Sequence, residues 1–162
     1  MAFRVGYGID FHEYQDGLEF YLGSIKLNED FGCIAHSDGD VLIHAVMDAL
    51  LGAMGLDDIG ELFPDSDEKF RNIRSTELLK EIMNILNDRK YRINNCDITI
   101  VAQKPRLSIY KQDIKREMAK LLNIELDSIS IKATTPEKMG DIGKNRGICA
   151  MATVLIERGS CE

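Results

Sequence analysis

Hydrophobic residues recur along the chain at two spacings, and each spacing predicts a different secondary structure. Alternating apolar and polar residues, or runs rich in β-branched residues and glycine, predict strands. Apolar residues three and four positions apart predict helices. The predicted strands span residues 3–12, 20–27, 97–103, 129–133 and 147–156. The predicted helices span residues 37–52, 75–88 and 108–122.

The order of these elements predicts the fold class, α+β. Two strands, two helices, a strand, a helix and two strands fit a single-domain α/β sandwich whose mixed sheet carries its helices on one face. The other face would present Val101, Met151 and Leu155, which are apolar, so we expect a subunit interface to cover it. A chain of 162 residues has the length of one domain, and we expect residues 1–162 to form it.

The composition limits the classes of partner. The chain is 44% hydrophobic and 29% charged, which is typical of a globular protein. Its formal net charge of −7 argues against nucleic acid as a partner, because no basic surface would neutralise the phosphates. An acidic protein can still bind phosphate groups where a metal ion or a helix N-terminus supplies positive charge.

Cysteine spacing and hydropathy indicate a cytoplasmic protein. The four cysteines form no CxxC pair, so we expect reduced thiols rather than a cysteine zinc site. They are Cys33, Cys96, Cys149 and Cys161. Residues 1–10 lack the basic and apolar regions of a signal peptide. No apolar run approaches the roughly 20 residues of a membrane span, so we expect no membrane partner.

Asp10 and His12 lie two residues apart on the first predicted strand, and this spacing places both side chains on one face. Zinc prefers imidazole nitrogen and carboxylate oxygen, and a catalytic zinc ion keeps one position open beside three protein ligands. The third ligand we predict is His44, the centre of a polar helical stripe with Asp40 and Asp48. Two alternatives stay open, because an Asp-x-His pattern also arises by chance and either acid of the stripe would equally hold His44.

Residues 132–140, which read KATTPEKMG, combine features of an anion site. Thr135 suits the N-cap of a helix, Pro136 the first helical position and Glu137 the first turn. The free N–H groups of such a helix start attract phosphate, and a glutamate there is able to hold a hard cation such as Mg²⁺. Spacing alone favours the simpler interpretation, a well-capped helix start without a ligand.

An acidic segment at residues 58–67 carries Gly60 and Pro64 within a predicted long loop at 57–72. Long loops in compact domains are often lids that close over a substrate and exclude water. A solvated connector would have the same composition, so composition leaves both interpretations open.

Four segments occur together in a characteristic order and spacing. They are GYGIDFH at 6–12, the HSDGDVLIH-containing stretch at 35–67, ITIVAQKPRL at 98–107 and IKATTPEKMG at 131–140. The string HSDGD…H…D…DIG…FPD within them is long enough to be highly specific. Together these segments resemble the family of 2-C-methyl-D-erythritol 2,4-cyclodiphosphate synthases, and the resemblance extends from about Arg4 to Ile156.

The resemblance implies an enzyme of the non-mevalonate isoprenoid pathway, a phosphorus–oxygen lyase. Its substrate would be 4-diphosphocytidyl-2-C-methyl-D-erythritol 2-phosphate. The 2-phosphate attacks the β-phosphorus of the diphosphate, CMP leaves, and a cyclic diphosphate forms. The resemblance also implies a homotrimer whose active sites lie between subunits.

The resemblance assigns the site residues as well. Asp10, His12 and His44 would bind Zn²⁺, and Glu137 would bind a second divalent cation, Mg²⁺ or Mn²⁺. The implied transition-state stabilisers are His36 and Thr135. The implied substrate contacts are Ser37 for the methylerythritol phosphate, Asp58, Ile59 and Gly60 for the ribose and substrate, Phe63, Pro64, Asp65, Ser66 and Asp67 for the mobile flap, Ala102, Gln103, Lys104, Pro105, Arg106, Leu107 and Ser108 for the cytidine pocket, and Thr134 and Lys144.

One segment departs from the family. The family commonly reads LGFTGRGEGI where this chain reads MGDIGKNRGI, so Asp141 and Lys144 stand at positions that are often Phe and Arg. In the family this segment lines the trimer axis, where an isoprenoid diphosphate can bind. The departure leaves that secondary binding open here.

Two other functions stay open from the sequence. A zinc hydrolase of nucleotide phosphoesters would use metal-bound water and release open-chain products. A trimeric regulator that binds metal or isoprenoid would show no turnover when its metals are restored after chelation.

Overall fold

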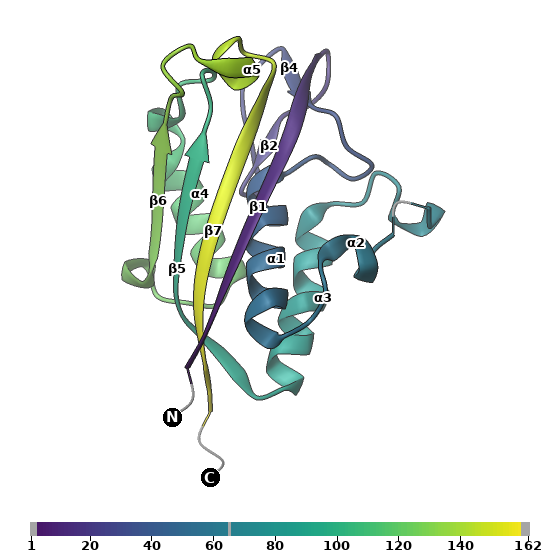
Figure 1. Ribbon diagram of the computed structural model, residues 1–162, viewed down its shortest axis with the longest axis vertical. Coiled ribbons are helices and arrows are strands. Elements are labelled where there is room, and N and C mark those ends of the chain that lie inside the picture. The colour runs from purple at the N-terminus through teal and green to yellow at the C-terminus, as the bar shows by residue number, and fades with distance from the viewer. Residues whose placement is uncertain (1–2, 65, 160–162) are drawn as a thin grey trace.

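A five-stranded sheet forms the centre of the computed structural model, which describes residues 3–64 and 66–159 (Figure 1). Its strand order is β4-β1-β7-β5-β6. The strands are β1 Phe3–Asp16, β4 Phe31–Cys33, β5 Tyr91–Val101, β6 Ile129–Thr134 and β7 Gly147–Arg158. β5 and β6 run parallel, whereas the β1–β7, β5–β7 and β1–β4 pairs are antiparallel, so the predicted mixed sheet is confirmed.

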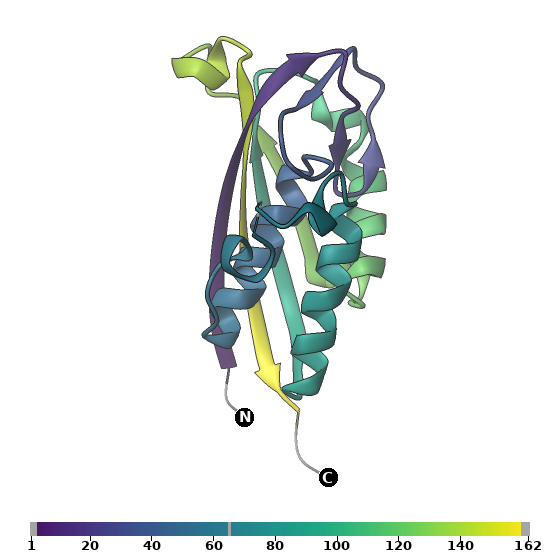
Figure 2. The same cartoon turned by 90° about the vertical axis from the view of Figure 1, so that its right-hand side faces the viewer.

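Three helices cover one face of this sheet (Figure 2). They are α1 Val41–Met54, α3 Ser75–Asp88 and α4 Lys111–Leu121. α1 lies against β1 and β7, α4 lies against β6, and α3 packs on α1 and β5. The inward residues of the alternating strands form the core, as the sequence predicted, and Ile98, Ile100, Ala150 and Ala152 are all buried. None of the helices in the described ranges combines the length and apolar character that a membrane span requires.

Short elements fill the connections, and several of them correct the prediction. The strand expected at 20–27 is a hairpin of two short strands that turns at Gly23 and Ser24, both with positive φ. β4 was not predicted, and the expected loop at 57–72 contains two helical turns. The short elements are β2 Tyr21–Leu22, β3 Ile25–Lys26, α2 Ile59–Leu62, η1 Glu68–Phe70, η2 Leu107–Ile109, η3 Leu126–Ser128 and α5 Gly140–Gly143.

The first helix begins later than predicted, at Val41 rather than Ser37, because Asp40 is its N-cap. The Asp40 carboxylate accepts the Ile43 N–H at 3.1 Å and also the N–H groups of Gly23 and Ser24 at 2.9 and 2.7 Å. Asp40 is completely buried. One carboxylate therefore caps α1 and fixes the β2–β3 hairpin to its start.

The helix start predicted at Thr135 is wrong. Glu137 and Lys138 have φ values of 53° and 64°, which are left-handed, and α5 begins only at Gly140. A tertiary contact overrides the local helix signal, since the Lys138 N–H donates to the Gln103 side chain at 3.0 Å. The free helical N–H groups expected to attract phosphate at this position are consequently missing.

The sheet face opposite the helices is apolar, as predicted. Val101, Met151 and Leu155 lie half-buried on it. β1 adds a longer apolar row than the sequence analysis anticipated, because alternate residues of this strand point away from α1. The row comprises Phe3, Val5, Tyr7, Ile9 and Phe11, which are 43–65% exposed. The three cysteines of the described ranges are buried, and Cys161 lies outside those ranges.

On the helix side, β1 and α1 approach each other closely at two glycines. A Cβ atom at Gly6 would lie 1.8 Å from the Ala49 carbonyl oxygen, and one at Gly8 would lie 2.0 Å from that of Ala45. Such distances are far below van der Waals contact, so only glycine permits this approach. Backbone is the obstacle at both positions, and it cannot rotate out of the way.

We predict that Gly6→Ala destabilises the protein by about 3 kcal/mol or prevents soluble accumulation, because the strand must move away from the helix. Gly52→Ala, in the same helix, is the matched control. A Cβ there meets no atom within 4 Å, and replacing glycine inside a helix should stabilise by about 0.5–1 kcal/mol. Urea unfolding midpoints measure both changes. Equal midpoints for Gly6→Ala and the wild type would contradict the close-packing argument.

Candidate metal centre

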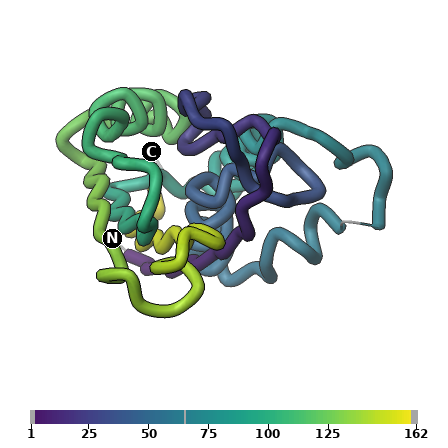
Figure 3. Tube along the Cα trace, turned by 90° about the horizontal axis from the view of Figure 1, so that it is seen from above, coloured from purple at the N-terminus to yellow at the C-terminus, as the bar shows by residue number. Residues whose placement is uncertain are grey.

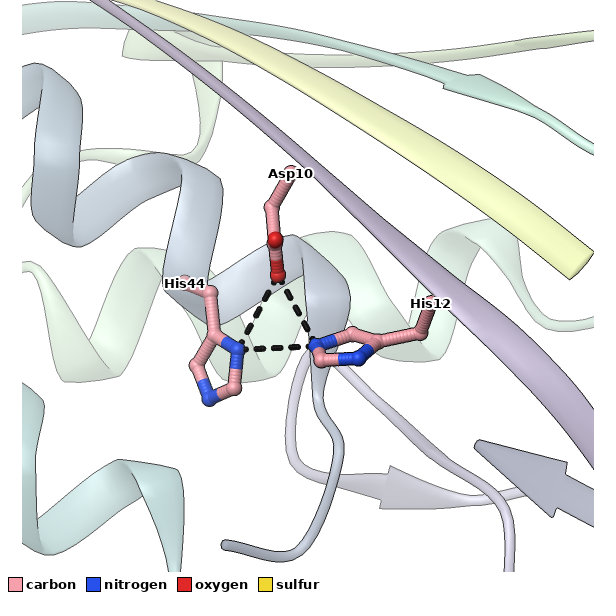
Figure 4. A group of neighbouring side chains, drawn as sticks. All are labelled: Asp10, His12 and His44. Carbon is pink, nitrogen blue, oxygen red and sulfur yellow. Dashed lines mark hydrogen bonds and ion pairs between the residues drawn. The ribbon is translucent and has the colours of Figure 1, made fainter. Parts of the chain in front are cut away.

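Asp10, His12 and His44 converge on one point between β1 and α1 (Figure 4). The Asp10 Oδ2 atom lies 2.9 Å from His12 Nε2 and 3.0 Å from His44 Nδ1. The two imidazole nitrogens are 3.1 Å apart. One carboxylate oxygen and two imidazole nitrogens within this distance form the donor set that zinc prefers.

Elementary geometry brings these side chains together. Asp10 and His12 share the inner face of β1 by their two-residue spacing, and the glycines before them let α1 come near. The alternative that Asp40 or Asp48 holds His44 is wrong, since the carboxylate bonded to His44 is that of Asp10. The predicted polar stripe of α1 does not face solvent, because Asp40 and His44 are buried.

The charges of the three side chains are strongly coupled. Burial by itself raises the pKa of Asp10, but hydrogen bonds and charge from His12 and His44 outweigh it and hold this pKa well below its ordinary value. Burial opposes protonation of His12, yet its hydrogen bond to Asp10 and the Asp10 charge raise the His12 pKa above 6.5. The centre thus favours a positive charge beside Asp10.

The orientation of His12 suits a divalent cation. Its Nδ1 atom lies 3.0 Å from the Ile34 carbonyl oxygen, which can only accept a hydrogen bond, so this nitrogen carries the proton. The Nε2 atom then faces Asp10 and His44, and its lone pair can bind a cation once it gives up the proton that it donates to Asp10. Backbone contacts of this kind fix the ring of a metal-binding histidine. The donor set and its support therefore fit a bound divalent metal ion.

A pocket of about 380 Å³ opens beside the three side chains. The predicted residues Ser37, Ile59, Gly60 and Phe63 line it. His36 lines it too, and its buried Nε2 atom has no hydrogen-bond partner among the described residues. An unpaired buried donor or acceptor is costly, so this nitrogen favours a polar ligand in the pocket.

The remaining predicted flap residues are neighbours in sequence of the lining residues Ile59, Gly60 and Phe63. Asp58 caps α2 through the Glu61 N–H at 3.1 Å, and Asp67 caps η1 through the Lys69 N–H at 3.1 Å. Pro64 and Ser66 are exposed, and Asp65 lies outside the described residues. The Asp48 carboxylate of α1 accepts the Ile59 N–H at 2.9 Å, so it anchors the start of this segment to the metal-centre helix.

The second group of predicted residues lies elsewhere in the chain. Gln103 and Lys138 are linked at 3.0 Å, and the Ala102 N–H donates to the Thr134 carbonyl at 3.1 Å, so the segments after β5 and β6 form one unit. Thr135 donates to Glu137 at 2.9 Å. This second group comprises Ala102, Gln103, Lys104, Pro105, Arg106, Leu107, Ser108, Thr134, Thr135 and Glu137, with Lys144 at the end of α5.

A single chain does not bring Glu137 to the three candidate metal ligands, although the Tyr14 hydroxyl of β1 donates to the Lys104 carbonyl at 2.8 Å. β6 is three strands from β1 in the sheet, which corresponds to roughly 14 Å. From above, the segment after β6 and the segment at 57–73 project on different sides of the molecule (Figure 3). Glu137 therefore does not join the Asp10, His12 and His44 cluster within one chain.

Two buried residues beside the centre were missed by the sequence analysis. The Ser75 hydroxyl lies 2.9 Å from His44 Nε2, and Asp38 contacts that hydroxyl. Backbone hydrogen bonds from Asn72 to His36 and from Asp38 to Ile73, at 2.8 and 3.1 Å, hold these segments side by side. Nothing in local periodicity signals such a pairing.

Comparison with known proteins identifies relatives along nearly the whole chain. The profile of the YgbB family matches residues 3–157. A bifunctional enzyme IspD/IspF of Aliarcobacter butzleri is 48% identical over 155 residues, covering 96% of this chain and 41% of the relative. The 2-C-methyl-D-erythritol 2,4-cyclodiphosphate synthase of Clostridium acetobutylicum is 46% identical over 153 residues, covering 94% of this chain and 99% of the relative.

Solved structures agree with the sequence relatives. A bifunctional IspDF from Campylobacter jejuni superposes with a TM-score of 0.93 at 39% identity, covering 98% of this chain and 43% of that one. An IspF of Plasmodium falciparum in complex with CDP gives a TM-score of 0.86 at 33% identity, covering 98% of both chains. This chain thus spans about two fifths of the bifunctional relatives. These names give no support to the hydrolase or regulator alternatives.

The pKa shifts predict how the metal-free protein responds to pH. Asp10 has a lowered pKa, so its stabilisation is present above about pH 4 and is lost as the pH falls toward that lowered value. His12 has a raised pKa, so its stabilisation is present below about pH 6.5 and is lost as the pH rises through the raised value. Both contributions are present together between these limits.

We therefore expect Asp10→Asn to destabilise the chelator-treated protein most near pH 5.5, on the order of 1 kcal/mol because the carboxylate is partly exposed. The difference should shrink toward pH 3 and toward pH 9. Urea midpoints of both proteins at these three pH values test the prediction. A difference that stays constant from pH 3 to pH 9 would contradict the coupling described above.

Proposed function

The chain belongs to the YgbB family of 2-C-methyl-D-erythritol 2,4-cyclodiphosphate synthases, and on this premise we propose that Asp10, His12 and His44 bind the zinc ion of such an enzyme. The family's reaction converts 4-diphosphocytidyl-2-C-methyl-D-erythritol 2-phosphate to the cyclodiphosphate in isoprenoid biosynthesis. The observation that carries the proposal is the convergence of three metal-ligating atoms beside the pocket that contains His36.

The reaction needs alignment and charge neutralisation more than covalent chemistry. An oxygen of the 2-phosphate forms a bond to the β-phosphorus, and the bond from that phosphorus to the CMP oxygen breaks. CMP keeps the electron pair, and no water enters. The divalent ions, when bound, polarise the phosphoryl oxygens and stabilise charge on the leaving phosphate.

The residues of the pocket orient the methylerythritol part of the substrate in this proposal. His36 and Ser37 line the pocket, and in this proposal His36 stabilises the transition state while Ser37 contacts the methylerythritol phosphate. Ile59, Gly60 and Phe63 close one wall, and the anchor from Asp48 fixes where that wall begins. An apolar wall excludes water and strengthens each polar contact made inside. Asp58 and the flap residues Pro64, Asp65, Ser66 and Asp67 complete this side as substrate contacts.

The second group of residues binds the nucleotide part of the substrate in this proposal. Glu137 holds the second divalent cation, Mg²⁺ or Mn²⁺, and Thr135 stabilises the transition state through its hydroxyl. The segment 102–108 receives the cytidine, with Thr134 and Lys144 as further contacts. The link between Gln103 and Lys138 supports this assignment, since it holds the cytidine segment beside the Glu137 turn.

Because Glu137 does not join the candidate metal ligands in one chain, we propose that neighbouring copies complete each site in a homotrimer. The exposed apolar row on β1 supports this assembly, since exposed patches of that extent mark interfaces. Head-to-tail contacts closed into a ring would place the second group of one copy beside the metal centre of the next. A single domain over residues 1–162 and a cytoplasmic location are part of the same proposal.

A metal and product analysis tests the zinc assignment. We expect purified protein to contain about one zinc ion per chain and His44→Ala to contain almost none. The same substitution should lower kcat/KM by roughly 10²- to 10³-fold or more, because charge on the phosphoryl group is no longer neutralised. Elemental analysis and ³¹P NMR of the products provide the measurements.

Asp113→Asn is the matched control, since Asp113 is an exposed acid on α4 that pairs with Arg116. It should retain both zinc and activity. Full zinc occupancy in His44→Ala would contradict the assignment. Reaction in ¹⁸O-labelled water separates the hydrolase alternative, because label in the product other than CMP would show that water attacked.

Mixing two inactive variants tests the shared site. His44→Ala damages the zinc side and Glu137→Gln damages the second-cation side. When equal amounts of the two are unfolded and refolded together, about a quarter of the sites in random trimers should combine two intact sides. Activity should therefore recover to about 25% of the wild type, measured as CMP release.

Each variant refolded alone is the control for this mixing experiment, and neither should regain activity. If every site lay within one chain, each chain in the mixture would carry a defect. The mixture would then stay inactive, and the intersubunit proposal would be wrong.

A further inference from the structure

The ring nitrogen of His44 that faces away from the metal centre is held by two serines. His44 Nε2 lies 2.9 Å from Ser75 Oγ and 3.1 Å from Ser37 Oγ. Ser75 is completely buried and His44 is only 7% exposed, so water cannot easily replace these partners. The hydrogen bond at this nitrogen decides which tautomer His44 adopts.

Asp38 determines how the Ser75 hydroxyl is used. Its Oδ1 atom is in close contact with Ser75 Oγ, and its Oδ2 atom accepts the Ser75 N–H at 3.1 Å and the Arg74 Nε–H at 2.8 Å. The Asp38 side chain is 6% exposed. A carboxylate with these donors acts only as an acceptor, so the single hydroxyl proton of Ser75 points to Asp38.

The direction of the next hydrogen bond follows from this constraint. Because the Ser75 hydroxyl already donates its one hydrogen bond to Asp38, its oxygen can only accept a hydrogen bond from His44. The Nε2 atom of His44 then carries a proton. Nδ1, which lies 3.0 Å from Asp10 Oδ2, is therefore the nitrogen that can bind a cation once it gives up the proton that it donates to Asp10. The opposite tautomer would direct an N–H group at the position of the cation.

We propose that Asp38 and Ser75 are positioning residues that lock His44 in the tautomer able to bind the metal ion. This inference rests on the proposed function and deepens it, since it names the residues that prepare one zinc ligand. Neither residue reaches the pocket lining, so both act through His44. Hydrogen-bonded partners behind a metal-binding histidine typically contribute 10- to 100-fold in metal affinity.

The supporting network extends one step further from the centre. The Arg74 guanidinium that pairs with Asp38 stacks at 3.9 Å from the centre of the Tyr21 ring. The backbone bonds between 36–38 and 72–73 tie the same loops together. Asp38 is therefore held by the Arg74 side chain, by the Ser75 N–H and by its own backbone bond to Ile73, which fixes how it contacts the Ser75 hydroxyl.

Asp38→Asn is the sharpest test, because it should reverse the direction of the two hydrogen bonds that link residue 38 to Ser75 and Ser75 to His44. The amide oxygen should face the two donors from Arg74 and the Ser75 backbone, at 2.8 and 3.1 Å, rather than the single longer contact of the Asp40 N–H at 3.3 Å. The NH₂ group then faces Ser75 Oγ. The Ser75 proton then points at His44 Nε2 and favours the tautomer with Nδ1–H. We expect zinc affinity to fall by about 100-fold.

Ser75→Ala provides an independent variant, because it removes the locking partner without reversing it. We expect zinc affinity to fall by about 10-fold. Thr76→Ala removes a hydroxyl from the next residue, which is not a partner of His44, and should leave affinity unchanged. Ser37→Ala should also leave zinc affinity within about threefold, since Ser75 remains.

Two measurements apply to each variant. Competition with a fluorescent chelator gives zinc affinity, and long-range ¹H–¹⁵N NMR of metal-free protein labelled on histidine reports which ring nitrogen carries the proton. The chain has three histidines, so the spectrum of His44→Gln identifies the His44 signals. We expect a proton on Nε2 in the wild type, Ser37→Ala and Thr76→Ala, and a proton on Nδ1 alone in Asp38→Asn.

The outcomes separate this inference from the proposed function. If the wild type binds zinc but Asp38→Asn and Ser75→Ala bind it equally well with His44 still protonated at Nε2, the positioning role is wrong and the zinc site stands. If the wild type binds no zinc, the proposed function fails, whereas the tautomer shift still tests Asp38 and Ser75. A tautomer change in Ser37→Ala alone would overturn the assignment to Ser75.

Discussion

The close contact between β1 and α1 determines how near His44 on the helix lies to Asp10 and His12 on the strand. At Gly6 and Gly8 the helix backbone lies where any side chain would intrude. Asp10 and His12 are the next two residues on the same face of the strand, and His44 precedes Ala45, whose carbonyl lies over Gly8. An ordinary spacing between helix and strand would pull His44 away from its two partners.

Because the Asp10 carboxylate is partly buried, its negative charge must be stabilised by neighbouring groups. A carboxylate in a partly apolar site needs positive charge or hydrogen bonds, and Asp10 receives them from two imidazoles. Each imidazole in turn is oriented from behind, His12 by the Ile34 carbonyl and His44 by serine. The three potential ligating atoms are thus already close together, so the binding of a metal ion would require little rearrangement.

The metal centre was predictable because its signals are local. Two-residue spacing on a strand and a histidine within a helical pattern are both visible in sequence, and the alternation of β5 and β7 revealed the core. The contacts that failed to appear in the sequence join distant segments. Asp38 reaches Ser75, and Gln103 reaches Lys138, which overrides the helix start expected at Thr135.

The assignment of roles such as those of Glu137 and Thr135 had a different origin. It came from resemblance to a family, since local spacing favoured a plain helix cap that the structure does not contain. Left-handed backbone at Glu137 and Lys138 turns this segment toward Gln103 instead of extending a helix. Periodicity cannot reveal such a turn, because it depends on a partner residue far away in sequence.

The charge of the pocket lining supports the proposal that neighbouring copies share each site. The described lining contains histidines, a serine and apolar residues together with Asp10, and neither a lysine nor an arginine. A chain of net charge −7 offers little long-range attraction to a polyanion. In the proposed enzyme, a cation held by Asp10, His12 and His44 would neutralise the phosphates on this side. Further positive charge and hydrogen-bond donors would come from another surface, and this is the chemical argument for the proposed site between copies.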